Sequence, residues 1–149
     1  PLGMETVRFL IATNPGQAPG PLGRVASGGE LSRLMLALKV VLASGSPVPT
    51  LVFDEVDAGI GGATAAAVGD RLSRVAEGVQ VLVVTHSPQV AARGVAHLMV
   101  AKREAKGRTE TRVLPLDGGQ RREEIARMLA GEVITEAARA AADSLLGAA

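Results

Sequence analysis

The sequence lacks several residue types on which common functional sites depend. Its 149 residues include no Cys, Trp or Tyr, and only two Phe and two His. Without cysteine there is no disulfide, no thiolate metal ligand and no cysteine nucleophile. The histidines, His86 and His97, are too far apart in sequence to form a helical zinc pair. Two phenylalanines are too few for the aromatic platform on which single-stranded nucleic acids stack.

The net charge is also small, and long hydrophobic runs are missing. Sixteen Lys and Arg against 15 Asp and Glu leave a formal charge of +1, so no overall basic field attracts nucleic acid. The densest apolar stretch, Leu34 to Ala43, is interrupted by Lys39 and falls short of the roughly 18 residues that suggest a membrane span. The 47% of hydrophobic residues suffices for a core at this length. We therefore expect an ordered domain without a membrane span.

A phosphate-binding P-loop is missing as well. That loop needs Gly followed directly by Lys and then Ser or Thr. None of the lysines fits, since Lys39, Lys102 and Lys106 follow Leu38, Ala101 and Ala105. The chain cannot grip a nucleotide through a P-loop of its own.

Hydrophobic periodicity predicts an α/β fold. The chain begins with a strand from Thr6 to Thr13, either half-exposed or at an edge, and a Pro- and Gly-rich loop without regular structure. A helix from Glu30 to Ala43 follows, which we expect to be almost wholly buried. Two continuous apolar strands, Thr50 to Phe53 and Val79 to Thr85, should be parallel and covered on both faces. The sheet is expected to be mostly parallel and flanked by helices.

The remaining elements complete this α/β prediction. The expected elements are a helix from Thr64 to Ala76 with Val68, Leu72, Val75 and Ala76 on its buried face, a short helix capped by the Ser87 hydroxyl, a hairpin of residues His97 to Lys102 and Thr109 to Leu116, and helices from Arg121 to Ala130 and Thr135 to Leu146. Ligands of parallel α/β folds bind at the carboxyl ends of the strands. That edge is where we expect the site.

The segment Ser27-Gly28-Gly29-Glu30 combines a capping pattern with two glycines. Ser and Glu at this spacing form a capping box, which accounts for Ser27 and Glu30. Consecutive glycines in a first helical turn need another reason, because each costs up to about 1 kcal/mol relative to alanine. Bare amides at a helix N-terminus bind anions, and we favour phosphate contact over capping alone.

Polar residues end both apolar strands. Asp54 and Glu55 follow the first strand and His86 ends the second. Two carboxylates at the end of a buried strand are costly without a cation or a proton to hold. Asp54 suits Mg²⁺, Glu55 suits a general base toward water, and His86 suits a donor to a phosphate oxygen. An acidic turn pair and a structural histidine are the plainer interpretations.

The next loop, Asp57-Ala58-Gly59-Ile60-Gly61-Gly62, allows two interpretations. It is either a flexible turn into the following helix or a loop that touches a facing subunit. Its spacing does not separate the two.

In order, these segments resemble the signature, Walker B, D-loop and switch-histidine motifs of ABC ATPases. The strings Val25 to Arg33, Phe53 to Gly61 and Val84 to Ala91 resemble the carboxyl-terminal part of the RecN family of SMC-like bacterial DNA repair proteins. The signature departs from the commonest ABC form by Glu30 in place of Gln and Ala26 in place of Leu.

The resemblance implies a head of two lobes that are separated in sequence by a long coiled coil. Two such heads would pair around two ATP molecules and bind DNA in double-strand break repair. It implies that Ser27, Gly28, Gly29 and Glu30 contact ATP of the other subunit, that Asp54 holds Mg²⁺, that Glu55 and His86 are catalytic, and that Asp57 belongs to the D-loop. It also implies a cytoplasmic, nucleoid-associated location.

On this interpretation, residues 1–149 form a single carboxyl-terminal head lobe whose Walker A lobe and coiled coil lie elsewhere. We expect such a piece to lack ATPase activity. The sheet edge and the apolar helix surface meant for its partner lobe should be left exposed or used in self-association. A transporter nucleotide-binding subunit and a non-catalytic docking lobe remain as alternatives. Basic residues that could face DNA are Arg33, Arg93, Lys102, Arg103, Lys106, Arg108, Arg121 and Arg122.

Overall fold

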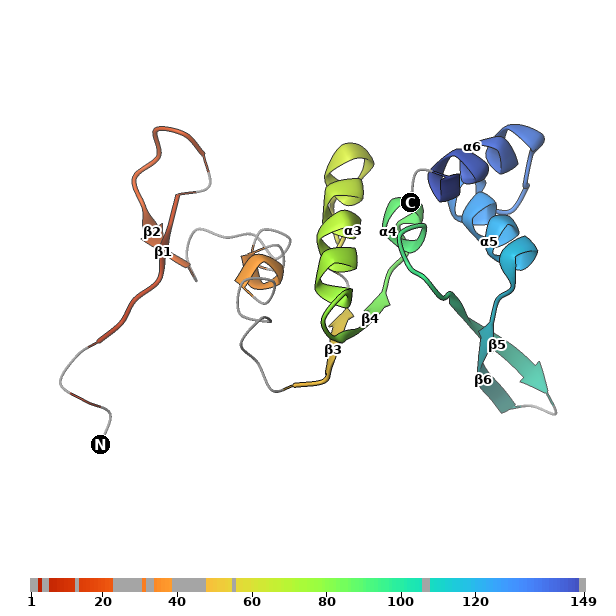
Figure 1. Ribbon diagram of the computed structural model, residues 1–149, viewed down its shortest axis with the longest axis horizontal. Helices are drawn as coiled ribbons and strands as arrows, with labels where there is room; N and C mark the ends of the chain where they lie inside the picture. Colours follow the sequence, from red (N-terminus) through yellow and green to blue (C-terminus); the bar gives the residue numbers. More distant parts are fainter. Residues whose placement is uncertain are drawn as a thin grey trace.

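The computed structural model describes residues 3, 6–12, 14–22, 31, 34–38, 48–54, 56–105 and 108–147. Its elements are β1 (Leu10–Ile11), β2 (Gly20–Pro21), β3 (Thr50–Asp54), α3 (Gly62–Ala76), β4 (Gln80–Val84), α4 (Pro88–Ala91), β5 (Leu98–Ala105), β6 (Arg108–Pro115), α5 (Gly118–Ala130) and α6 (Glu136–Gly147). Figure 1 shows β1 and β2 at one end of the molecule and α5 and α6 at the other. No helix in these ranges is long and apolar enough to cross a membrane.

The central unit is a parallel pair of strands joined through α3. β3 and β4 pair from Thr50 opposite Gln80 to Asp54 opposite Val84, which confirms the predicted parallel pairing. α3 packs its apolar face toward this pair, so Val68 and Leu72 join Phe53 in one core cluster. Ala76, expected on the same face, is exposed, whereas its neighbour Val75 is buried as predicted.

Only one face of this strand pair is covered in the part of the chain that the structure describes. Phe53 is 3% exposed, whereas Val52 and Val84 are each 57% exposed and Leu82 is 44% exposed. The prediction that both faces are covered was therefore wrong for these strands. An apolar face left bare in this way needs a partner to exclude water from it.

The helix predicted from Glu30 to Ala43 is described at Leu31 and residues 34–38, which are helical. Leu36 is buried at 5% exposure, while Met35 is 44% and Leu31 38% exposed. The prediction that this helix is almost wholly buried was therefore wrong for the described part, because the described core contacts only one side of the helix.

β5 and β6 form the predicted antiparallel hairpin, with Leu98 opposite Pro115 and Ala105 opposite Arg108. Every residue of β6 is exposed. Within the described ranges, the three sheets have two strands each and only β3 with β4 is parallel. The α/β fold is thus confirmed, with the predicted hairpin separate from the parallel pair, because strands joined by turns this short are antiparallel.

The α5 and α6 helices form a second, alanine-rich core. Ile125, Ala126 and Ala142 are fully buried and pack with Ala92 of the segment after α4. The small alanines let the two helices approach closely around Ile125. This second core fixes α5 and α6 against the end of α4.

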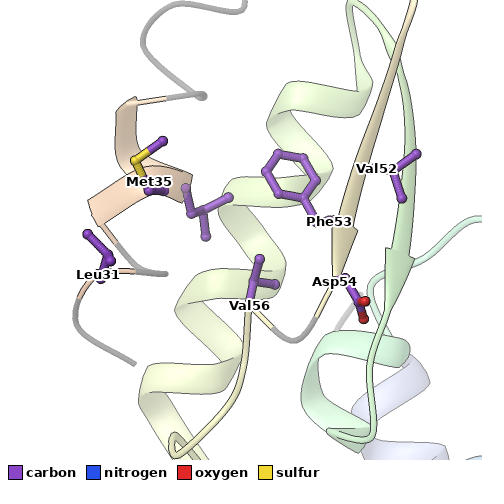
Figure 2. A pocket seen from close by; sticks show the side chains of 7 residues that line it. Leu31, Met35, Val52, Phe53, Asp54 and Val56 are labelled. Carbon is purple, nitrogen blue, oxygen red and sulfur yellow. The ribbon is translucent and has the colours of Figure 1, made fainter. Parts of the chain in front are cut away.

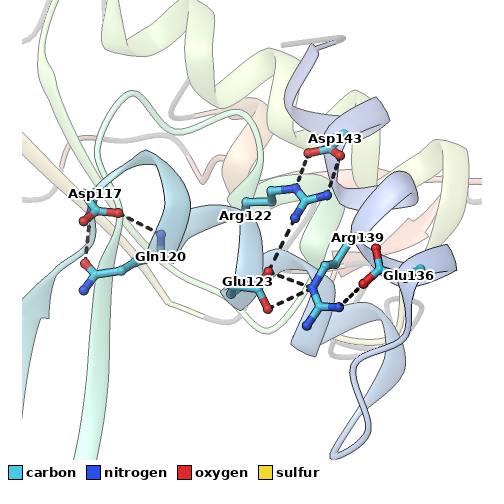
Figure 3. Close-up of polar contacts among 7 residues, drawn as sticks. All are labelled: Asp117, Gln120, Arg122, Glu123, Glu136, Arg139 and Asp143. Carbon is cyan, nitrogen blue, oxygen red and sulfur yellow. Dashed lines mark hydrogen bonds and ion pairs between the residues drawn. The ribbon is translucent and has the colours of Figure 1, made fainter.

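Ion pairs connect the outer surfaces of the two helices (Figure 3). Arg122 of α5 binds Asp143 of α6 at 2.6 Å, and Arg139 of α6 binds Glu123 of α5 at 2.8 Å. The Arg122 hydrogen bond lowers the pKa of the Asp143 carboxyl, and the Arg139 hydrogen bond lowers that of Glu123. Because these side chains are at least partly exposed, salt should screen the pairs.

The amino-terminal strand is much shorter than predicted. Of the range Thr6 to Thr13, only Leu10–Ile11 is a strand, paired with Gly20–Pro21 in the loop expected to be irregular, and Thr13 lies outside the described residues. Phe9 is 67% and Val7 79% exposed. Alternation alone does not hold a strand that has no packed face.

The cap of α4 also differs from its prediction. Ser87 occupies the N-cap position, but its side chain makes no capping hydrogen bond. Its hydroxyl lies 2.9 Å from the Gln89 Oε1 and donates to that oxygen instead.

Candidate functional site

The parallel pair brings Asp54 and His86 to one edge of the sheet. Asp54 is the last residue of β3 and lies opposite Val84, so His86 follows only two residues beyond that pair. Both side chains are exposed. This edge is the carboxyl end of both strands, where the sequence predicted the site to be.

Asp54 borders a shallow pocket of about 270 Å³ (Figure 2). The other lining side chains are apolar: Leu31, Met35, Leu36, Val52, Phe53 and Val56. Figure 2 shows Val52 and Phe53 on opposite sides of β3. The pocket thus offers one carboxylate beside an apolar wall.

The donor set at this edge fits a hydrated Mg²⁺ better than an ion enclosed by protein. Among the side chains that the structure describes, no three acidic or histidine groups gather as a metal site. Mg²⁺ typically keeps several waters and binds one or two carboxylates together with phosphate oxygens. An exposed carboxylate such as Asp54 matches that preference.

Asp57 lies behind the edge and is fully buried. The Thr85 hydroxyl donates to its Oδ2 at 2.5 Å, and the Ser87 backbone N–H donates to the same oxygen at 3.1 Å. The carboxylate of Asp57 therefore bonds within the chain. Any contact of this loop with a facing subunit would come from its exposed residues, such as Gly59 and Gly61.

Several predicted site residues lie outside the described residues. These are Ser27, Gly28, Gly29 and Glu30 of the signature-like segment, and Glu55 after β3. Their proposed roles remain predictions from the sequence.

Neither Thr85 nor Ser87 was predicted as a site residue. Thr85 was expected only as the end of a strand and Ser87 only as a helix cap. Their shared acceptor, Asp57, is about 30 residues earlier in the chain, and no local pattern reveals a partner at that separation.

Three of the basic residues predicted as candidates for DNA contact make contacts within the chain. Arg93 pairs with Asp70 at 2.8 Å, Arg122 pairs with Asp143, and Arg121 donates to the Ala92 and Gly94 carbonyls at 2.6 and 2.5 Å. The exposed Lys102, Arg103 and Arg108 of the hairpin remain candidates, whereas Arg33 and Lys106 lie outside the described residues.

His97 is separate from the strand edge. Partial burial lowers the pKa of its imidazole, the nearby Arg121 charge lowers it further, and Glu124 opposes both effects. The net effect favours the neutral form of the His97 imidazole.

Comparison with curated proteins identifies relatives along nearly the whole chain. The DNA repair protein RecN of Vibrio cholerae is 54% identical over 149 residues, which are 100% of this chain and 27% of the relative. RecN of Deinococcus radiodurans is 52% identical over 145 residues, 97% of this chain and 25% of the relative. RecN of Bacillus subtilis is 46% identical over 144 residues, which are 97% of this chain and 25% of the relative. The chain spans about a quarter of the length of these relatives, and no protein-family model matches it.

Solved structures show the same fold at low sequence identity. An SMC ATPase from work on ATP-driven dimerization and DNA-stimulated activation superposes with a TM-score of 0.58 at 20% identity, covering 83% of this chain and 81% of that chain. The Smc head domain of Pyrococcus yayanosii superposes with a TM-score of 0.58 at 24% identity, covering 78% of this chain and 24% of that chain. The chain is therefore similar to RecN proteins along nearly its whole length, corresponds to their carboxyl-terminal part, and has the fold of an SMC ATPase head.

Proposed function

We propose that this chain is the carboxyl-terminal lobe of the ATP-hydrolysing head of a RecN-type DNA repair protein. The observation that carries the proposal is the parallel register of β3 and β4, because it places Asp54 and the His86 segment at one strand edge. The similarity to RecN proteins over the whole chain supports the same assignment.

Each residue at this edge has a distinct task in the proposal. Asp54 holds Mg²⁺, and bound Mg²⁺ neutralises charge on the nucleotide phosphates. Glu55 accepts a proton from the attacking water, and His86 donates a hydrogen bond to a γ-phosphate oxygen. The P-loop that grips this ATP belongs to another part of the protein, since the chain has none.

The signature-like segment acts on a second nucleotide. Ser27, Gly28, Gly29 and Glu30 contact the ATP held by a facing head, so two heads enclose two ATP molecules. The description of the similar SMC ATPase structure, ATP-driven dimerization and DNA-stimulated activation, supports self-association and a DNA partner. A DNA-bound head of this kind would work in the cytoplasm, at the nucleoid, in double-strand break repair.

The two alternatives have less support. The relatives found are DNA repair proteins rather than transporter subunits, and this disfavours a transporter. A lobe that only docks on a partner would have no need for Asp54 and His86 at the same edge.

Reconstitution tests the proposal directly. Mixing this chain with the separately expressed amino-terminal part of its protein should give a one-to-one complex that hydrolyses ATP, because each part supplies what the other lacks. Light scattering after size-exclusion chromatography measures the complex, and phosphate release measures turnover. Equal turnover by this chain alone would contradict the assignment.

A further inference from the structure

The buried carboxylate of Asp57 joins the two loops that leave the strand edge. Asp57 follows β3, whereas Thr85 and Ser87 follow β4 on either side of His86. Asp57 Oδ2 accepts hydrogen bonds from the Thr85 hydroxyl and the Ser87 N–H. The same Ser87 N–H also lies 2.9 Å from the Thr85 Oγ1, so the three groups form a closed triangle.

Connecting the two loops through this buried carboxylate lowers the stability of the fold. Asp57 is 0% exposed, and its other oxygen, Oδ1, is buried with no hydrogen-bond partner among the described residues. A buried carboxylate with unmet hydrogen-bonding capacity destabilises a fold relative to a well-packed apolar side chain. Such a group in a native structure calls for a role beyond packing.

The position of the triangle indicates that role. His86 is exposed, and the described hydrogen bonds at this edge hold its two neighbours rather than its ring. Fixing the backbone on both sides of a residue restricts where its side chain leaves the sheet edge. A functional site needs such fixed neighbouring residues to keep a reacting side chain in place.

We propose that Asp57 is a positioning residue, whose carboxylate holds Thr85 and Ser87 so that His86 is directed toward the nucleotide phosphate. This inference rests on the proposed function for the identity of the ligand. It assigns the carboxylate a task within its own chain rather than at the surface of a facing subunit.

Two substitutions at Thr85 separate the hydrogen bond from packing. Thr85→Val removes the hydroxyl and keeps the shape, whereas Thr85→Ser keeps the hydroxyl and removes a methyl group. Because the chain has only two histidines, NMR of this full chain with histidine ¹³C-labelled at Cε1 should give one ring signal each for His86 and His97. We expect Thr85→Val to shift the His86 signal and leave His97 unchanged, and Thr85→Ser to keep both as in the wild type.

Amide exchange gives a readout without any substitution. The Ser87 N–H bonds to a buried oxygen and should exchange with solvent more slowly than the N–H of exposed residues. Rapid Ser87 exchange in the wild type, or an unchanged His86 signal in a folded Thr85→Val chain, would overturn the positioning role. The His97 signal reports whether the variant is folded.

The complete protein supplies the functional readout. Thr85→Val should lower kcat for ATP by about 10-fold or more with KM nearly unchanged, as expected when a residue orients a reacting group without touching the substrate. Thr85→Ser should restore kcat. If Glu55→Gln abolishes turnover but Thr85→Val does not reduce kcat, the positioning role alone fails. If Glu55→Gln leaves turnover unchanged, the proposed function fails, and the NMR result for His86 still decides the positioning role.

Discussion

Replacing Glu55 by Gln in the complete protein should reduce ATP turnover by about 10²–10⁴-fold, the usual contribution of a general base. The amide has nearly the shape of the carboxylate but cannot accept the proton of the attacking water. On the proposed function, nucleotide binding should persist because neither Asp54 nor the P-loop assigned to the other lobe is changed. We therefore expect ATP-dependent dimers to form and to last longer than those of the wild type.

Phosphate release and light scattering with ATP measure these two results. Glu132→Gln is the matched control, since Glu132 is an exposed acid in the turn between α5 and α6, far along the chain from β3. It should leave both turnover and dimers unchanged. A Glu55→Gln protein with wild-type turnover would show that Glu55 is not the base.

Replacing Ile125 by Ala should lower the free energy of unfolding by about 2–5 kcal/mol, the range for large-to-small substitutions in a core. Ile125 is fully buried at the centre of the cluster that joins α5, α6 and Ala92. The other buried members of the cluster are alanines, which are too short to fill the space that the substitution leaves. Much of the cavity should therefore remain.

Urea unfolding of the chain, followed by circular dichroism, measures the loss. Ile125→Val is the graded control and should cost only about 0.5–1.5 kcal/mol. Leu129→Ala, at a position 38% exposed on the same helix, should cost less than Ile125→Ala. Equal losses for Ile125→Ala and Leu129→Ala would contradict the assignment of Ile125 to the core.

Local sequence signals predicted the middle and the end of the chain well. The strands Thr50–Asp54 and Gln80–Val84, the hairpin and the helices α5 and α6 were each placed within a few residues. Apolar runs, turn residues and helical periodicity act over short distances, so they are visible in the sequence. The capping box of Asp117 and Gln120 at the start of α5 is a signal of the same kind.

Features that depend on distant or external surfaces were not predictable in this way. The sequence of β3 does not reveal that Val52 is uncovered, because burial of that face depends on residues that pack against it from elsewhere. The bond from Thr85 to Asp57 spans 28 residues and has no local pattern. At the candidate site, the shared edge of Asp54 and His86 was predictable, but the inward direction of Asp57 was not.

The central claim is that each head supplies Glu55 to one ATP and the signature segment to another. Mixing two inactive complete proteins, Ser27→Arg and Glu55→Gln, and measuring phosphate release tests it most directly. In a mixed dimer, one ATP would meet an intact Glu55 from the first protein and an intact Ser27 from the second. We predict that turnover recovers in part on mixing, whereas a mixture as inactive as either variant alone would contradict the claim.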